Sequence, residues 1–123
     1  MKKRIMIVDD DPDILISIRK IFEKEGYEVF TVDSGKDCIH EVENGFKGPI
    51  LMDIMMPFMD GWDTIEELTK RGLSKNIIVS ILTAKDIPDP DINELKEYIK
   101  DYIIKPFEPQ ELSTIVRNYF KNN

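Results

Sequence analysis

Acidic side chains directly follow two of the apolar segments in this sequence. Three consecutive aspartates, Asp9 to Asp11, come after the apolar residues 4–8, and Asp53 comes after residues 49–52. Adjacent carboxylates repel one another: at about 4 Å and an effective dielectric constant near 20, each pair costs roughly 4 kcal/mol. The aspartate run is therefore either a solvated turn or part of a site that binds a cation.

Two further polar residues end later apolar segments. Thr83 stands in "SILTA" after residues 77–82, and Lys105 ends the segment "YIIK". A carboxylate, a hydroxyl, an ammonium and a divalent cation around one point provide the groups of phosphoryl transfer: a nucleophile, a hydrogen-bond donor and two positive charges. Whether these residues meet depends on the elements that carry them.

The chain alternates short apolar runs with helix-like segments. The runs are 4–8, 27–32, 49–52, 77–82 and 102–105. Four of them are almost entirely apolar, which is typical of parallel strands covered on both faces. The run 27–32 alternates more, as expected of an edge strand.

Helical periodicity follows each run. Asp11 can cap the first helix, Pro12 suits its first position, and Gly26 closes it. The other helices are expected after Ser34, after Gly61 up to Gly72, after "PDPD", and after "PFEP". The fourth of the five would carry Ile92, Leu95 and Ile99 on its apolar face.

This alternation predicts an α/β fold with a parallel sheet and right-handed crossovers. The expected architecture is a flavodoxin-like, doubly wound (βα)5 sandwich with strand order 2-1-3-4-5. In such sheets ligands bind at the carboxyl ends of strands one and three, where the winding reverses. Asp9, Asp10 and Asp53 should then converge in one crevice, and Thr83 and Lys105 should face the same edge.

The expected cation is Mg²⁺, a hard ion that prefers carboxylate, carbonyl and water oxygens and is often completed by phosphate. Asp53 is the natural nucleophile because it lies between the Asp9/Asp10 pair and the strand ends at Thr83 and Lys105. A zinc site of the usual four nitrogen and sulfur ligands is excluded, because the chain has one cysteine and one histidine.

Composition narrows the function classes. The 123 residues suit one domain, and the formal net charge of −7 argues against direct nucleic-acid binding, which needs a basic face. No apolar run reaches the roughly 18 residues of a membrane span, and the N-terminus is too short in apolar residues for a signal peptide. The single Cys38 excludes an internal disulfide and fits a reducing, cytoplasmic location.

Four motifs occur in order over nearly the whole chain: "VDDD" after the first run, "LMDIMMPFMDG" around Asp53, "LTA" at Thr83 and "DYIIKPF" at Lys105. Together they closely resemble the CheY-like receiver domain of two-component response regulators. The resemblance implies that Asp53 is the phosphoacceptor. It also implies that Thr83 and Lys105 bind the phosphoryl oxygens.

The resemblance further implies a Mg²⁺ site made by Asp10, Asp53 and the backbone carbonyl of Met55, with Asp9 supporting it through water. The family's switch aromatic corresponds to Tyr102. The family's typically cis Lys–Pro bond corresponds to Lys105–Pro106.

A mechanism follows from this resemblance. A histidine kinase or phosphotransfer protein would donate the phosphoryl group, and Thr83 would move inward to donate a hydrogen bond to it. Tyr102 would then move from exposed to buried, which changes the face made by the fourth helix, the last strand and the last helix. A downstream protein or a missing effector domain would read that face. Plain packing remains an alternative for Tyr102.

Two departures from the family pattern stand out. Phe58 occupies the place of the glycine in the usual "MPGMDG", where a positive φ disfavours a bulky side chain. The loop should therefore be strained or bend differently. The segment before the last strand lacks the small-residue turn of the family, so the fourth helix is expected to be short or displaced. The methionines around Asp53 are expected as core filler, with a promiscuous partner surface as the alternative; they are Met52, Met55, Met56 and Met59.

Residues 1–123 are thus expected to form a single receiver domain with no effector domain, not an enzyme acting on outside substrates. The sequence fits either a stand-alone regulator or a piece of a longer one. One alternative is a phosphorylation-independent interaction module of the same fold. The other is an aspartate-nucleophile phosphohydrolase of the haloacid-dehalogenase type, which would want a second Asp where Met55 stands.

Overall fold

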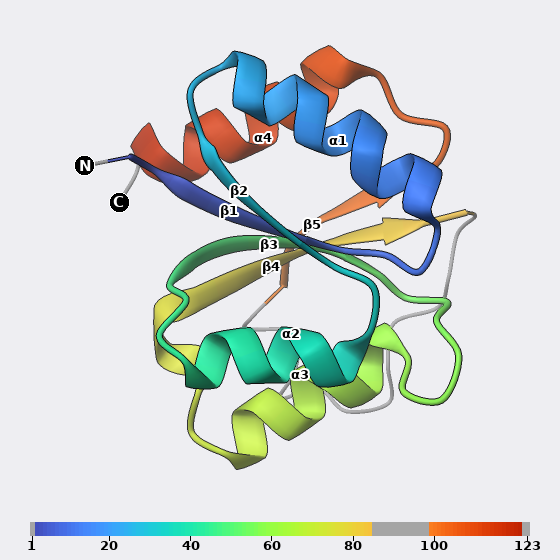
Figure 1. The fold of residues 1–123 in the computed structure, drawn as a ribbon, viewed down its shortest axis with the longest axis vertical. Helices are drawn as coiled ribbons and strands as arrows, with labels where there is room; N and C mark the ends of the chain where they lie inside the picture. The colour runs from blue at the N-terminus through green and yellow to red at the C-terminus, as the bar shows by residue number, and fades with distance from the viewer. Residues whose placement is uncertain (1, 85–98, 122–123) are drawn as a thin grey trace.

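A computed structural model of the chain describes residues 2–84 and 99–121. In these residues one parallel sheet has the strand order β2-β1-β3-β4-β5, as predicted (Figure 1). Its strands are β1 (Arg4–Val8), β2 (Glu28–Val32), β3 (Gly48–Asp53), β4 (Ile77–Thr83) and β5 (Ile99–Ile104). The alternating run 27–32 is indeed an edge strand.

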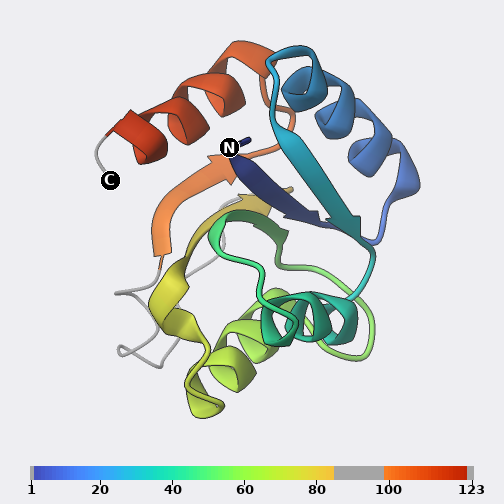
Figure 2. The ribbon, with the colours of Figure 1, turned by 60° about the vertical axis from the view of Figure 1, so that its left-hand side comes forward.

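Helices cover both faces of the sheet. They are α1 (Pro12–Lys24), α2 (Gly35–Glu43), α3 (Gly61–Lys70) and α4 (Pro109–Lys121), with a short 3₁₀ turn at Ser74–Asn76. Figures 1 and 2 show α1 and α4 on one face and α2 and α3 on the other. The structure is the doubly wound sandwich that the alternation of runs predicts.

Side-chain caps fix where the helices begin. The Asp11 carboxylate accepts the Asp13 N–H at 2.9 Å and begins α1, with Pro12 in its first position. Ser34 Oγ begins α2 in the same way. Asp60 and Asp63 form a reciprocal capping box that begins α3 at Gly61. The predicted caps Asp11 and Ser34 are confirmed.

The core has two parts, one on each face of the sheet. Strands β1 and β3 are buried on both faces, which matches their continuous apolar sequences. The α1/α4 side is filled around Phe22 and Leu112, and the α2/α3 side around Phe46 and Leu68. Because the central strands are buried along their length, they are accessible only at their ends. The predicted site residues lie at the carboxyl ends.

The C-terminal end predicted for the fourth helix is wrong. Ile99 was expected on the fourth helix, but it lies in β5 and pairs with Val79. The reason is that β4 is seven residues long and offers backbone groups along its whole edge, so the chain pairs with it three residues before Tyr102. The rest of the expected fourth helix, including Ile92 and Leu95, lies outside the described residues.

Each helix in the described part of the chain is too short or too polar to cross a bilayer.

Candidate functional site

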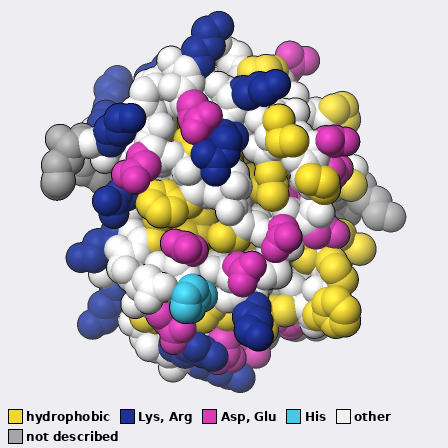
Figure 3. Space-filling view, viewed as in Figure 1, with side chains coloured by type: hydrophobic (Ala, Val, Ile, Leu, Met, Phe, Trp, Pro, Cys, Tyr) yellow, Lys and Arg dark blue, Asp and Glu magenta, His cyan; other side chains and the backbone are white. Residues whose placement is uncertain are grey.

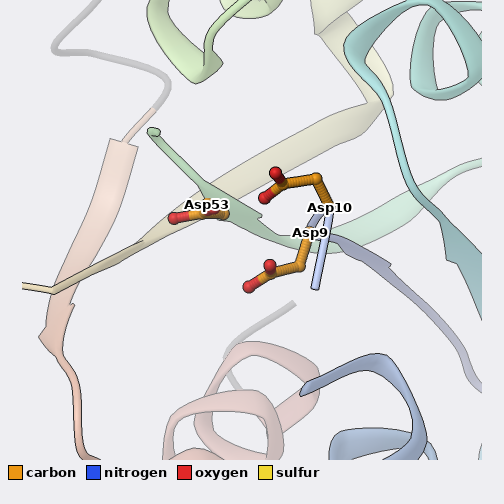
Figure 4. Close-up of side chains that lie close together, drawn as sticks. All are labelled: Asp9, Asp10 and Asp53. Atoms are coloured by element: carbon orange, nitrogen blue, oxygen red, sulfur yellow. The ribbon is translucent and has the colours of Figure 1, made fainter. Parts of the chain in front are cut away.

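Three carboxylates meet where β1 and β3 end. The two strands are neighbours, with Val8 beside Met52, so Asp9 and Asp10 follow β1 next to Asp53 at the end of β3. One oxygen from each carboxylate lies within 4.8 Å of the others, and Figure 4 shows the side chains extending in the same direction. The predicted convergence is confirmed.

The cluster has the chemistry of a site for a hard cation. Asp9 and Asp53 are buried, whereas Asp10 is exposed and leaves the cluster open to solvent on that side. Carboxylate oxygens at this spacing suit a divalent ion such as Mg²⁺ or Ca²⁺. The acidic pocket could therefore bind a metal.

Lys105 supplies positive charge to the cluster. Its Nζ donates a hydrogen bond to Asp9 Oδ2 at 2.9 Å and lies 3.6 Å from Asp53 Oδ1. Burial acts to lower the pKa of Lys105, but the hydrogen bond to Asp9 and the charges of both aspartates outweigh it, so this pKa lies above its usual value. Lys105 is therefore a cation at neutral pH.

Asp9 is the closer partner of Lys105, which sequence reasoning did not anticipate. Its other oxygen, Oδ1, accepts the Asp11 N–H at 2.9 Å, so both oxygens of this fully buried carboxylate have a partner. Strand order alone places Lys105 nearer Asp53, because β3 is closer to β5 than β1 is. A lysine side chain is long enough to extend past the end of β3 to Asp9, and the sequence does not show which aspartate it reaches.

The pKa of Asp53 is shifted by the surroundings of this side chain. Burial and then the charge of Asp9 raise its pKa from 3.8 to about 6, and Asp10 adds a smaller effect in the same direction. Lys105 and the backbone N–H of Met55 act against the rise. With a pKa of about 6, Asp53 is mainly ionised at neutral pH, and a cation beside it would favour the ionised form further.

Thr83 lies at the same edge of the sheet. It ends β4, next to the Leu82 that pairs with Asp53, and its side chain is buried. The Lys105 N–H donates to the Thr83 carbonyl at 2.6 Å, which ties the segment after β5 to the end of β4. The predicted grouping of Thr83, Lys105 and Asp53 at one edge is confirmed. The Lys105–Pro106 bond is cis, as the resemblance implied.

Tyr102 is in an outward position on β5. It is 44% exposed, and its ring centroid lies 6.4 Å from that of Trp62 on α3. This is the exposed arrangement expected before phosphorylation. The switching role of Tyr102 stays a prediction.

The loop after Asp53 contains two tight three-residue turns. The Met56 N–H donates to the Ile54 carbonyl at 3.1 Å, and the Met59 N–H donates to the Pro57 carbonyl at 2.7 Å. The central residue of the second turn is Phe58, whose φ is +67°. The strain predicted for this phenylalanine is therefore confirmed, at a cost of about 1–2 kcal/mol.

The methionines of this segment do not behave alike. Met52 and Met56 are buried and Met59 packs against the core, as predicted. Met55 is 67% exposed, so the core-filler interpretation is wrong for it. The tight turn around Met55 directs this side chain outward while its backbone stays beside Asp53.

Gly61 allows α3 to begin against the end of β3. A Cβ at this position would lie 2.7 Å from the Asp53 carbonyl oxygen and 2.8 Å from Ile54 Cδ1. The Gly61 N–H also donates to the Ile54 carbonyl at 2.9 Å. This glycine is a positioning residue for Asp53 that sequence reasoning recognised only as part of a motif.

These features define a receiver domain: a doubly wound sheet with an acidic cluster, a lysine and a threonine at its carboxyl edge. The sequence profile described as "Response regulator receiver domain" matches residues 5–117. The chain belongs to this family of two-component signalling proteins.

Solved structures of receiver domains are similar to this chain in both sequence and fold. A CheY-like receiver domain protein from Methanospirillum hungatei JF-1 is 40% identical over the full length of both chains, with a TM-score of 0.91. The receiver domain of Francisella response regulator 1452 is 30% identical, with a TM-score of 0.84 and 98% of each chain covered.

Relatives found by sequence are regulators of about twice the length. The chain is 39% identical over 114 residues to the response regulator SaeR of Staphylococcus aureus, covering 93% of this chain and 49% of SaeR. It is 32% identical over 117 residues to the alkaline phosphatase synthesis transcriptional regulatory protein PhoP of Bacillus subtilis, covering 95% of this chain and 48% of PhoP. The chain therefore spans about half the length of these curated relatives.

Family membership favours one of the rival functions. Receiver domains of response regulators act as phosphoacceptor switches, and they are generally not enzymes that turn over outside substrates. Neither the phosphohydrolase nor the phosphorylation-independent module is favoured by these findings.

Proposed function

We propose that Asp53 accepts a phosphoryl group from a phosphohistidine of a histidine kinase or phosphotransfer protein, in a reaction that requires Mg²⁺. The observation that carries this proposal is the acidic cluster itself: three carboxylates within 4.8 Å, one of them Asp53, with Lys105 as the single lysine that bridges two of them among residues 2–84 and 99–121. One ammonium does not neutralise three carboxylates, so the cluster favours a bound divalent cation.

The residues present fit Mg²⁺. Asp10 and Asp53 would hold the ion together with the backbone carbonyl of Met55, and Asp9 would support it through water. All these donors are oxygens, as a hard cation requires. When bound, the ion supplies charge neutralisation for the phosphoryl oxygens.

The transfer is a displacement at phosphorus. An oxygen of ionised Asp53 forms the new O–P bond as the N–P bond of the phosphohistidine breaks. The imidazole leaves with the bonding electron pair and takes a proton from solvent. Because the pKa of Asp53 is raised to about 6, the nucleophilic carboxylate predominates above that pH.

Lys105 and Thr83 would respond to the new charge. Lys105 can exchange Asp9 for a phosphoryl oxygen, because its Nζ already lies 3.6 Å from Asp53 Oδ1. The Thr83 hydroxyl would donate a second hydrogen bond, and Tyr102 would follow inward. The face that contains β5 and α4 would change, and either a separate protein or an effector domain would read it.

The chain would thus act only on itself, through its own phosphorylation and slow dephosphorylation. We place this exchange in the cytoplasm, since the single Cys38 is a free, buried thiol. The formal net charge of the chain, −7, argues against direct nucleic-acid binding by this domain.

Incubation with Mg²⁺ and acetyl phosphate, followed by mass measurement of the intact protein, tests the proposal. A single phosphoryl adduct should form, and it should be absent in EDTA and in Asp53→Asn. An adduct that persists in Asp53→Asn would place the acceptor elsewhere, and no adduct on the wild-type protein would refute the function.

A further inference from the structure

Phe58 is a fully exposed aromatic side chain in a strained backbone conformation. Its ring is not part of either core cluster, so it adds no packing that would offset a positive φ. A backbone outlier of this kind, at the edge of a functional site, is evidence for a role outside folding. Met55, also a large and exposed hydrophobic residue of this loop, lies two residues from Asp53.

The loop that carries both side chains is fixed at its base. The Ile54 carbonyl accepts the Met56 N–H at 3.1 Å as the loop leaves β3 and the Gly61 N–H at 2.9 Å as it enters α3. Both ends of the loop are therefore anchored on the residue next to Asp53. A fixed loop holds Phe58 in a constant place relative to the acceptor, which lowers the entropy cost of binding a partner there.

The location limits what can cover this surface. Asp53 is only 5% exposed, so a donor must bring its phosphoryl group in at the carboxyl edge, where the β3–α3 loop forms part of the rim (Figure 1). A protein donor has a surface around its phosphorylated side chain and must lie against this rim. A small donor such as acetyl phosphate need not touch it.

The negative charge near the site explains why apolar side chains would help a donor to bind. The chain is acidic overall, and Asp10, Asp60 and Asp63 all lie near this edge. Figure 3 shows Lys and Arg mainly on the left, top and bottom of this face, and hydrophobic side chains mixed with acidic ones along the right, where the loop lies. Phosphorylated donors are anionic at the point of contact, so the acidic side chains around the site oppose their approach, while Lys105 and a bound Mg²⁺ would favour it only at the site itself. Apolar contact attracts them regardless of charge.

We propose that Phe58, with Met55 in the same loop, is an apolar anchor for the protein that donates the phosphoryl group to Asp53. This inference rests on the proposed function, because it names a surface that the donor contacts. It concerns this chain's own departure from the glycine of its family motif. Phe58 is a positioning residue for the donor and takes no part in the chemistry.

The test compares a small donor with protein donors on the same variants. The variants are Phe58→Gly, which relieves the backbone strain, Phe58→Ser, which keeps it, and Phe58→Tyr, which keeps the ring. The small donor is acetyl phosphate. The protein donors are a panel of purified histidine-kinase dimerisation domains carrying ³²P-phosphohistidine, with initial transfer rates measured across receiver concentrations.

With acetyl phosphate and Mg²⁺, all three variants should form the adduct at the wild-type rate. With the kinase domains, Phe58→Gly and Phe58→Ser should lose roughly tenfold in kcat/KM, mainly through KM, as expected for loss of an interface anchor. Phe58→Tyr should stay within about twofold of the wild type.

Equal transfer to the wild type and to Phe58→Ser from every kinase domain would overturn the inference. So would faster transfer to either variant, which would make Phe58 an obstacle, and so would a panel that fails to phosphorylate the wild type at all. Failure of the proposed function gives a different result, since the wild type would then form no adduct with acetyl phosphate.

Discussion

Replacing Asp53 by Asn should stabilise the protein, because burial makes the charge of this side chain costly. The pKa of Asp53 rises from 3.8 to about 6 on folding. Each unit corresponds to 1.36 kcal/mol, so ionised Asp53 destabilises the metal-free protein by roughly 3 kcal/mol at pH 7.5. The amide of Asn has a similar shape and no charge to bury.

The sign of the pH dependence follows from proton binding. Between about pH 4 and pH 6 the folded protein retains a proton on Asp53 that the unfolded chain has released. The contribution of Asp53 to the free energy of unfolding therefore falls as pH rises through this interval and is constant above it. At pH 5 the advantage of Asp53→Asn should be about half of its value at pH 7.5.

Urea unfolding of both proteins in EDTA at pH 5 and pH 7.5 measures these differences. The control is Glu111→Gln, the same chemical change on an exposed residue in the first turn of α4. It should lose a few tenths of a kcal/mol of helix-dipole interaction and gain nothing. Mg²⁺ should then stabilise the wild type and leave Asp53→Asn nearly unchanged.

This prediction fails if Asp53→Asn is no more stable than the wild type at pH 7.5. It also fails if the gap between them is the same at both pH values, because the gain would then not come from the charge of Asp53.

Three further substitutions test the loop and the switch. Phe58→Gly should raise the free energy of unfolding by about 0.5–1 kcal/mol in urea, since relief of the positive φ outweighs the entropy cost of glycine. Gly61→Ala should lower it by about 1–3 kcal/mol, because the new Cβ would lie 2.7 Å from the Asp53 carbonyl oxygen. It should also slow adduct formation with acetyl phosphate, measured by mass. Thr83→Ala should form the adduct at nearly the wild-type rate but lose the accompanying change in fluorescence of Trp62, the only tryptophan in the chain.

Matched variants separate these effects from general damage. Phe58→Ser keeps the positive φ and should not share the gain of Phe58→Gly; equal stabilisation by both would exclude backbone strain as the cause. Gly72→Ala also forces a side chain onto a positive φ, but a Cβ there has no neighbour within 4 Å. It should cost stability without slowing phosphorylation. Loss of the adduct in a folded Thr83→Ala would show that Thr83 is needed for the chemistry itself.

The fold could be predicted from sequence because its signals are local and agree with one another. Apolar strand runs, Asp11 with Pro12, and Ser34 each fix an element within a few residues. The crevice followed from strand order, since carboxyl ends of adjacent parallel strands meet at one edge. Asp9, Asp10 and Asp53 could thus be assigned to one site from the sequence alone.

What could not be predicted depends on contacts between distant residues. The i, i+4 spacing of Leu95 and Ile99 fits a helix, yet pairing with β4 makes Ile99 a strand residue. The preference of Lys105 for Asp9 depends on the path of one long side chain. The outward direction of Met55 depends on a turn that methionine itself does not encode.

The ion pair between Lys105 and Asp9 joins residues 96 positions apart in the sequence. During synthesis, strands β1 and β3 can pair long before residue 105 has left the ribosome, and until then the aspartates lack their lysine. A nascent or truncated chain therefore has an unbalanced, easily protonated acceptor. In a chain without Lys105, one of the two groups that lower the pKa of Asp53 would therefore be missing.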